Sequence, residues 1–247
     1  MPETAPLAKR RRADSLSARW ATVEGVAGVC IYGSVARGDA SETSDIDIIV
    51  LSSNPELTSE ELVSDSHEAE LEDVSVRVYT DEDLVMHLTN SPIFAAHLRL
   101  EGVIAFDREM QLHSILQRDY PISVSDELNW QRKNLELYVH SERFGRALLF
   151  PLARLYSIGR ATVFSRLCEQ GVLEFDAPRA FATLQRVRPE WRQAIDTVGE
   201  LRPFFQSVRS DVSSSEWPFS PYTIEARARF DSARTAIQSL LADSGDA

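Results

Sequence analysis

The hydrophobic pattern of the first half of the chain predicts strands. Residues 26–32 and 46–51 are two short, mostly apolar runs rich in β-branched side chains, as found in strands that are buried on both faces. Residues 71–80 alternate between valine and polar side chains, which is the pattern of a strand with one buried face. A fourth short run, residues 102–106, has the same β-rich character. These runs together predict a small mixed sheet.

Helix signals separate these strands. Asp14 or Ser15 could cap a helix that Gly25 ends, and the residues before it are interpreted as a polar, frayed terminus. Asp81 is predicted to cap a second helix, and Ser91-Pro92 opens a third, since proline is favoured in the first turn of a helix. The first part of the chain is therefore expected to be an α+β domain with flanking helices.

Beyond residue 122 the apolar positions follow helical spacing. No strand-like alternation occurs from residue 125 onward, and glycines and prolines divide the chain into several helical segments. We therefore predict two domains, residues 1–122 and residues 123–247. The second is expected to be an all-α helical bundle.

The composition is that of an ordinary globular protein. Of the 247 residues 43% are hydrophobic, and no run approaches the roughly 20 apolar residues that a membrane-spanning helix needs. Cys30 and Cys168 match no metal-binding or redox spacing. With no signal-peptide pattern at the N-terminus, these features predict a cytoplasmic protein without membrane partners.

Negative charge is concentrated in the first half of the chain. The formal net charge is −12, with 10 basic and 22 acidic residues in residues 1–122 against 16 and 16 in residues 123–247. A negative surface repels a nucleic-acid backbone and attracts cationic ligands. The basic run at residues 9–12 is interpreted as a solvated terminus without a role in the chemistry.

Asp45-Ile46-Asp47 places two carboxylates at the start of a predicted strand. Because side chains alternate along a strand, both carboxylates are expected on one face while Ile46 points into the core. Two carboxylates so close together repel each other unless a cation lies between them. Magnesium bound to nucleotide phosphates takes only one or two carboxylates from the protein. The pair therefore predicts a magnesium site.

Gly33-Ser34 and Gly38 lie between the first two predicted strands. Backbone N–H groups and the Ser34 hydroxyl at the start of a short helix can bind an anion, and Gly38 lets the loop turn back. A phosphate-binding turn that precedes a metal-binding carboxylate pair predicts phosphoryl or nucleotidyl transfer. In such a reaction metal ions stabilise the attacking and leaving oxygens.

The segment 33–47 resembles the signature of the DNA polymerase β-like nucleotidyltransferase superfamily. The matching positions are Gly33, Ser34, Gly38, Ser44, Asp45 and Asp47. The stretch 101–107 is also similar to small members of the superfamily, which extends the resemblance to roughly residues 20–118. The two-part plan is similar to that of aminoglycoside nucleotidyltransferases and of toxin–antitoxin nucleotidyltransferases.

The resemblance implies roles for individual residues. Asp45 and Asp47 would hold the Mg²⁺, expected as two ions, while Gly33 and Ser34 would contact the triphosphate of ATP or another nucleoside triphosphate. The remaining predicted nucleotide-binding positions are Arg37, Gly38 and Ser44. Arg37 is expected either to bind a phosphate or to form an ion pair.

The family pattern also places a third carboxylate on the next strand, and here the sequence departs from it. Hydrophobic alternation puts Ser75 where an aspartate is expected, with Asp73 two residues earlier on the same face. We predict Asp73 as the third catalytic and metal-binding carboxylate.

The implied function is that of a magnesium-dependent nucleotidyltransferase. It would move a nucleoside monophosphate, AMP from ATP by first expectation, to an acceptor hydroxyl and release pyrophosphate. An acidic first domain suits a cationic small molecule such as an aminoglycoside. The alternatives are a protein or an RNA 3′ end as acceptor, in a toxin–antitoxin or defence system, and a nucleotide-binding module with weak catalysis. The sequence leaves the acceptor, the base and the oligomeric state open.

Overall fold

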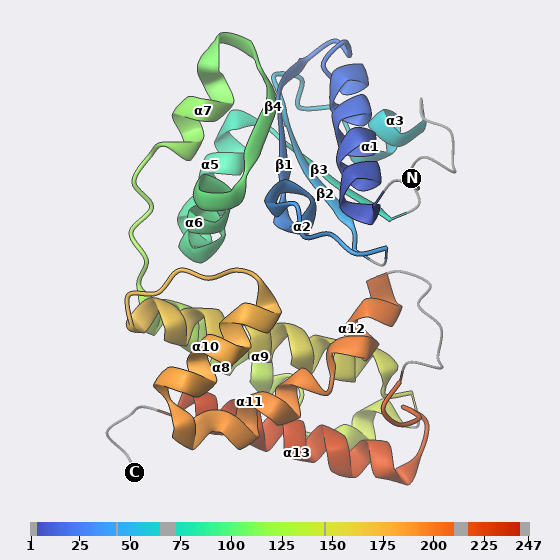
Figure 1. Ribbon diagram of the computed structural model, residues 1–247, viewed down its shortest axis with the longest axis vertical. Coiled ribbons are helices and arrows are strands. Elements are labelled where there is room, and N and C mark those ends of the chain that lie inside the picture. Colours follow the sequence, from blue (N-terminus) through green and yellow to red (C-terminus); the bar gives the residue numbers. More distant parts are fainter. Residues whose placement is uncertain (1–3, 43, 65–72, 146, 210–216, 243–247) are drawn as a thin grey trace. The chain divides into compact units, whose positions relative to one another are not determined.

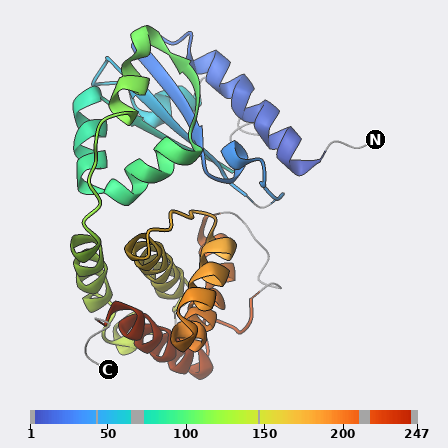
Figure 2. The same cartoon turned by 60° about the vertical axis from the view of Figure 1, so that its left-hand side comes forward.

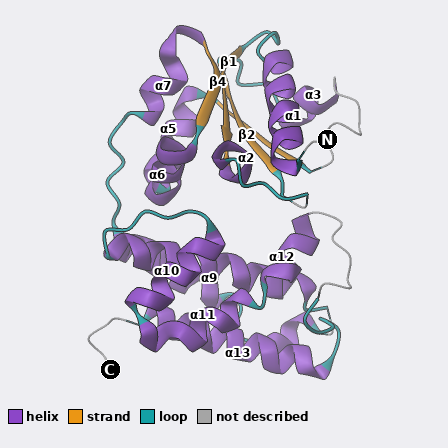
Figure 3. Cartoon of the chain, viewed as in Figure 1, coloured by secondary structure: helices purple, strands orange, loops and turns teal. Residues whose placement is uncertain are grey.

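The computed structural model describes residues 4–42, 44–64, 73–145, 147–209 and 217–242. The chain divides into two compact units, Met1–Ile122 and Ser123–Ala247. The described strands belong to the first unit, and the described regular structure of the second is helical (Figure 3). The fold class predicted from the sequence, an α+β unit followed in the chain by an all-α unit, is confirmed.

The first unit is built on a mixed four-stranded sheet with the order β3-β2-β1-β4. Its strands are β1 (Val26–Tyr32), β2 (Ile46–Ser52), β3 (Val74–Tyr79) and β4 (Val103–Asp107). β1 is antiparallel to both β2 and β4, whereas β2 and β3 are parallel. All four predicted strands are confirmed, although positions 71 and 72 of the third prediction lie outside the described residues.

One face of the sheet is covered by α1 (Ala5–Trp20), with α3 (Ser59–Ser64) beside β3 (Figure 1). Leu16 and Trp20 of α1 pack in one apolar cluster with β1 and β2. The Trp20 indole Nε1 also donates a hydrogen bond of 3.1 Å to the carbonyl of Leu62 in α3. A buried indole thus keeps its polar N–H satisfied and joins the two helices.

α1 begins at Ala5, so the predicted helix start at Asp14 or Ser15 is wrong. Proline occupies its first turn, arginine is a good helix former, and Arg10 pairs with Asp14 one turn later at 2.9 Å. The run at residues 9–12 is therefore helical, and Lys9 within it is buried. The interpretation of this run as a solvated terminus is corrected.

The opposite face of the sheet is covered by three helices, as Figure 2 shows from a second direction. They are α5 (Asp81–Asn90), α6 (Pro92–Glu101) and α7 (Gln111–Leu116), the last preceded by a 3₁₀ turn at Arg108–Met110. The N-cap of α5 is Thr80, whose hydroxyl accepts a 3.1 Å hydrogen bond from the Asp83 N–H. The prediction of Asp81 as this cap is wrong by one residue.

The second unit packs around one long helix, α9 (Leu149–Glu169). Its other helices are α8 (Val124–Glu136), α10 (Ala177–Val187), α11 (Arg192–Gly199), α12 (Arg202–Arg209) and α13 (Ile224–Leu241), with 3₁₀ turns at Ser141–Phe144 and Pro189–Trp191. Arg166 of α9 is buried, and its Nε donates 2.8 Å to the Leu240 carbonyl of α13. In the described ranges, no helix has the length and apolar character needed to cross a membrane.

Candidate active site

The ends of β1 and β2 bring the two predicted motifs together. Tyr32, the last residue of β1, lies opposite Asp47 in the antiparallel pair, so the helix α2 (Gly33–Arg37) begins beside the start of β2. Gly33 has a φ of +72°, and a Cβ built there would lie 3.0 Å from Asp47 Oδ2. The carboxylate of Asp47 therefore lies against the backbone of the turn, which favours glycine for both its φ and its lack of a side chain.

Asp45 and Asp47 flank Ile46, which is fully buried in the α1-facing core. Both aspartates are partly exposed. This arrangement fits magnesium, a hard cation that takes one or two protein carboxylates and completes its shell with water and phosphate oxygens. Among the described residues, no group of three or more His, Cys, Asp or Glu side chains could hold a metal. A magnesium ion here would depend on nucleotide phosphates for further ligands.

Gly38 closes the short helix α2. Its φ is +81°, a left-handed conformation, and its N–H donates to the Ser34 carbonyl at 3.0 Å. Nothing lies within 4 Å of a Cβ built at Gly38, so this glycine serves the backbone conformation and not a close contact. Ser34 is partly exposed in the first turn of α2, and its contact with a triphosphate stays a prediction.

Ser44 shapes the loop that leads into Asp45. Its hydroxyl accepts a 2.8 Å hydrogen bond from the Ser41 N–H, and its own N–H donates to the Ser41 carbonyl at 3.1 Å. Lys9 Nζ donates to the Ser44 carbonyl. The structure thus gives Ser44 a part in loop geometry, and its predicted role in nucleotide binding stays a prediction.

Asp73 lies one residue before β3 and has a φ of +66°, which is uncommon for a residue other than glycine. Its carboxylate accepts hydrogen bonds from Lys9 Nζ and, at 2.8 Å, from Arg12 Nη1. This backbone conformation removes Asp73 from the regular strand alternation used to place it beside Asp47. Ser75 lies directly opposite Asp47 in the β2–β3 pair. The role of Asp73 as third carboxylate stays a prediction, and it would require exchange of these two cations for a metal.

The ion pairs of Asp73 have a measurable consequence for stability. Replacing Lys9 with methionine would leave the mostly buried Asp73 with Arg12 alone and the Ser44 carbonyl without its donor. We expect the free energy of unfolding to fall by about 2 kcal/mol, because a buried charge that loses a partner is costly. Urea denaturation measures this loss. Arg10→Met is the control, since it removes an exposed pair and is expected to cost less than about 0.5 kcal/mol. Equal effects of the two substitutions would contradict the assignment.

Arg37 is the last residue of α2 and already holds two acidic partners. Its Nη1 donates to Glu101 at 2.7 Å and its Nε to Asp39 at 3.2 Å. Burial opposes the charge of Arg37, but the hydrogen bonds and charges of Glu101 and Asp39 outweigh it and raise the arginine's pKa. Arg37 was predicted as a phosphate ligand or an ion-pair partner, and the structure shows it as an ion-pair partner.

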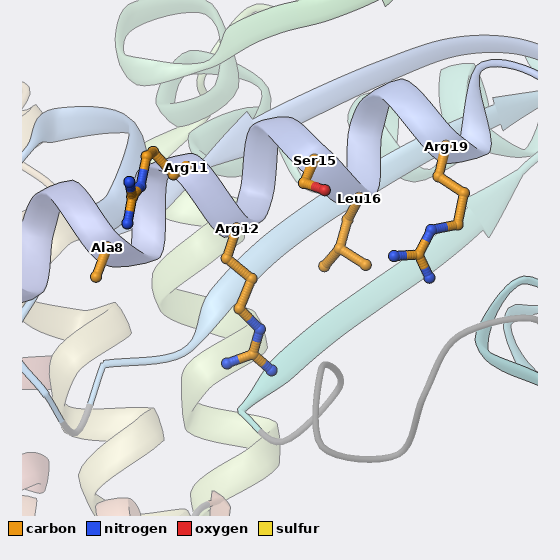
Figure 4. A pocket seen from close by; sticks show the side chains of 6 residues that line it. All are labelled: Ala8, Arg11, Arg12, Ser15, Leu16 and Arg19. Atoms are coloured by element: carbon orange, nitrogen blue, oxygen red, sulfur yellow. The ribbon is translucent and has the colours of Figure 1, made fainter.

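A pocket of about 290 Å³ lies along α1 (Figure 4). Arg12, Leu16 and Arg19 project from the same side of the helix toward it. Its full lining is Ala8, Arg11, Arg12, Ser15, Leu16 and Arg19. Arg12 is engaged by Asp73, and neither Arg11 nor Arg19 is without a partner. None of the described residues of 33–47 lines this pocket, and it meets the candidate residues through the contact of Arg12 with Asp73.

Sequence reasoning missed several side chains near the site. His97 Nε2 and Glu101 Oε2 lie 2.9 Å apart, and their i, i+4 spacing on a predicted helix was the available signal. Arg77 of β3 has its pKa raised, first by a hydrogen bond with Tyr79 and further by charges that include Asp47, although burial opposes this. Lys9 offered no signal, because its partners are 35 and 64 residues away in the chain.

Comparison with known proteins identifies the fold. Residues 10–105 match the family model of the nucleotidyltransferase domain. A spectinomycin adenyltransferase from Enterococcus faecialis, solved with ATP and spectinomycin, is 11% identical with a TM-score of 0.53, covering 96% of this chain and 100% of that one. This likeness extends over both units and shows a shared fold.

Two further solved structures are similar at lower scores. A nucleotidyltransferase-like protein from Exiguobacterium sibiricum is 14% identical with a TM-score of 0.35, covering 94% of this chain and 74% of that one. A toxin–antitoxin structure with AMP-PNP is 15% identical with a TM-score of 0.33, covering 52% of this chain and 94% of that one. No curated protein sequence matches. The matched residues 10–105 include most of the sheet and the turn that carries the motif, so the family match falls on the first unit.

Proposed function

We propose that this protein transfers AMP from ATP to the hydroxyl of a small, cationic acceptor such as an aminoglycoside. The observation that carries the proposal is the placement of Asp47 against the Gly33 turn, with Asp45 two residues earlier on the same loop-to-strand junction. A carboxylate pair beside a tight turn suits a magnesium-bound triphosphate. In the reaction, the acceptor oxygen bonds to the α-phosphorus, the bond to the β-phosphate oxygen breaks, and pyrophosphate leaves.

Each residue of the motif has a defined task in this proposal. Asp45 and Asp47 hold Mg²⁺, which supplies charge stabilisation for the attacking and leaving oxygens when bound. Gly33 leaves room for the Asp47 carboxylate, and Ser34 presents its N–H and hydroxyl to the triphosphate. Gly38 and Ser44 fix the ends of the connecting loop, through α2 and through the Ser41 contacts respectively.

Two observations support a small cationic acceptor. The fold is shared along the whole chain with an enzyme named for adenylyl transfer to spectinomycin. The acidic excess lies in residues 1–122, where 22 acidic residues face 10 basic ones, and such a surface attracts cations. A protein hydroxyl or an RNA 3′ end would use the same chemistry on a different acceptor, and these acceptors are separate arms of the test.

One observation favours a second candidate function, a nucleotide-binding module with little turnover. Ser75 stands opposite Asp47, and the carboxylate of Asp73 is held by Lys9 and Arg12. With Asp73 so held, the site would rely on two carboxylates and would have no evident base for the acceptor hydroxyl. Such a protein would bind ATP and Mg²⁺ without releasing pyrophosphate.

The test is pyrophosphate release from each of the four ribonucleoside triphosphates with Mg²⁺. The acceptor arms are a panel of aminoglycosides, bulk transfer RNA and a protein lysate, each measured with and without EDTA. We expect release that depends on ATP, on Mg²⁺ and on an aminoglycoside. Release only with transfer RNA or lysate would replace the acceptor class. ATP binding without release in any arm would establish the binding module instead.

A further inference from the structure

Arg37 and Glu101 join the two helices that end beside the candidate site. Arg37 is the last residue of α2 and Glu101 the last residue of α6, and the Nη1–Oε2 distance is 2.7 Å. Their side chains are only 16% and 14% exposed. The contact spans 64 residues of sequence, so it fixes the end of the short helix α2 to a separate, longer helix.

His97 adds a second contact to the same carboxylate oxygen. Its Nε2 lies 2.9 Å from Glu101 Oε2, and its ring forms a T-shaped contact with the ring of Tyr32, with centroids 5.9 Å apart. Tyr32 directly precedes Gly33, whereas Arg37 lies at the other end of α2. The contacts through Glu101 and His97 therefore hold the Gly33–Ser34 turn from both sides.

The surroundings of Glu101 determine the direction of its pKa shift. Burial alone would raise the pKa of Glu101, but hydrogen bonds and charges from His97 and Arg37 outweigh it and lower the pKa. The carboxylate is therefore ionised at neutral pH. The Arg37–Glu101 pair is largely shielded from solvent. Losing either partner therefore leaves the charge of the other uncompensated in a mostly buried place.

We propose that Arg37, Glu101 and His97 form a brace that holds α2, and with it the Gly33–Ser34 turn, in the conformation that receives the nucleoside triphosphate. Arg37 is then a positioning residue that acts through Glu101, and not a ligand of the phosphates. This inference rests on the proposed function, since it concerns the same nucleotide site. Its distinctive feature is that Glu101, an acidic residue, supports the binding of an anion.

The experiment compares binding of α,β-methylene-ATP with Mg²⁺ to the full-length chain by calorimetry. The variants are Arg37→Gln, Glu101→Gln, both together, and the exchanged pair Arg37→Glu/Glu101→Arg. We expect each single variant to bind the analogue about tenfold more weakly than the wild type. The double variant should bind no more weakly than either single variant, because the effects of substituting two partners of one ion pair are not additive. The exchanged pair is expected to recover part of the affinity.

A direct phosphate contact gives the opposite pattern. Glu101→Gln would then leave the affinity unchanged or improve it, since it frees Arg37, and the exchanged pair would bind worst. Either result overturns the brace. Glu169→Gln is the matched control, because Glu169 pairs with Arg166 in the other unit at 2.9 Å and should leave binding unchanged. Far-UV circular dichroism and urea midpoints show that each variant is folded at the assay temperature.

Failure of the proposed function looks different. If the wild-type chain does not bind the analogue with Mg²⁺, the proposed function and the brace are both overturned. If the wild type binds and Glu101→Gln binds equally well, the brace alone is overturned and the proposed function stands.

Discussion

Asp47→Asn is expected to lower acceptor-dependent pyrophosphate release by about a thousandfold while leaving the chain folded. The change replaces a charged metal ligand by a neutral amide of the same shape. Metal ions contribute several kcal/mol to such reactions, and each 1.36 kcal/mol is about tenfold in rate. Asp45→Asn is expected to have a comparable effect. Steady-state pyrophosphate release at saturating Mg²⁺ measures both.

The control for this prediction is Glu42→Gln. It removes one negative charge from the same exposed loop without touching the carboxylate pair, so activity should stay near that of the wild type. Circular dichroism and a urea midpoint show whether Asp47→Asn keeps its fold. If Asp47→Asn and Glu42→Gln have equal activity in a folded protein, Asp47 does not hold the catalytic metal.

Gly33→Ala is expected to reduce the same activity by about a hundredfold, in addition to a loss of about 1–2 kcal/mol of stability. The stability loss arises because alanine is strained at a φ of +72°. The larger loss of activity arises because the new methyl would lie 3.0 Å from Asp47 Oδ2 and would displace the carboxylate. Misplacement of a catalytic group by about 1 Å can cost about a hundredfold in rate.

Gly38→Ala separates these two effects. Gly38 also has a left-handed φ, of +81°, but nothing lies within 4 Å of its added Cβ. We therefore expect a similar loss of stability with most of the activity retained. Equal loss of activity in Gly33→Ala and Gly38→Ala would show that backbone strain, and not contact with Asp47, is the cause.

The strands and the carboxylate pair could be predicted because their signals are local. A buried strand is a short β-branched run, and Asp45 and Asp47 flank an apolar residue whatever the rest of the chain does. Alternation correctly assigned Ile46 to the core. The same rule placed Asp73 on the strand face, and it failed there because Asp73 precedes β3 with a positive φ.

The remaining features of the site depend on contacts that sequence patterns do not encode. Lys9 was interpreted as part of a solvated terminus, and its burial follows from partners 35 and 64 residues away. Arg37 was predicted as a phosphate ligand or an ion-pair partner, and in the fold it reaches Glu101 at the end of α6. A charged residue in a loop has no local signal that tells a phosphate ligand from an ion-pair partner. The fold determines which of the two roles the residue has.

The contacts of Asp73, the predicted third carboxylate, bear on the mechanism. If turnover is found, either Asp73 exchanges Lys9 and Arg12 for the metal or another group accepts the hydroxyl proton. Lys9→Met, proposed above for stability, also informs this point. A rise in activity despite lower stability would indicate that Lys9 restrains a catalytic Asp73.

The most direct test of the central claim is to follow ATP labelled with ³²P at either the α- or the γ-phosphate. In the presence of Mg²⁺ and the acceptor identified by the pyrophosphate screen, we predict that the α-label enters the acceptor and that the γ-label leaves as pyrophosphate. Neither transfer of the α-label nor release of labelled pyrophosphate should be detected with Asp45→Asn or Asp47→Asn. Transfer of the γ-label to the acceptor, or transfer of the α-label that persists in both variants, would contradict the account.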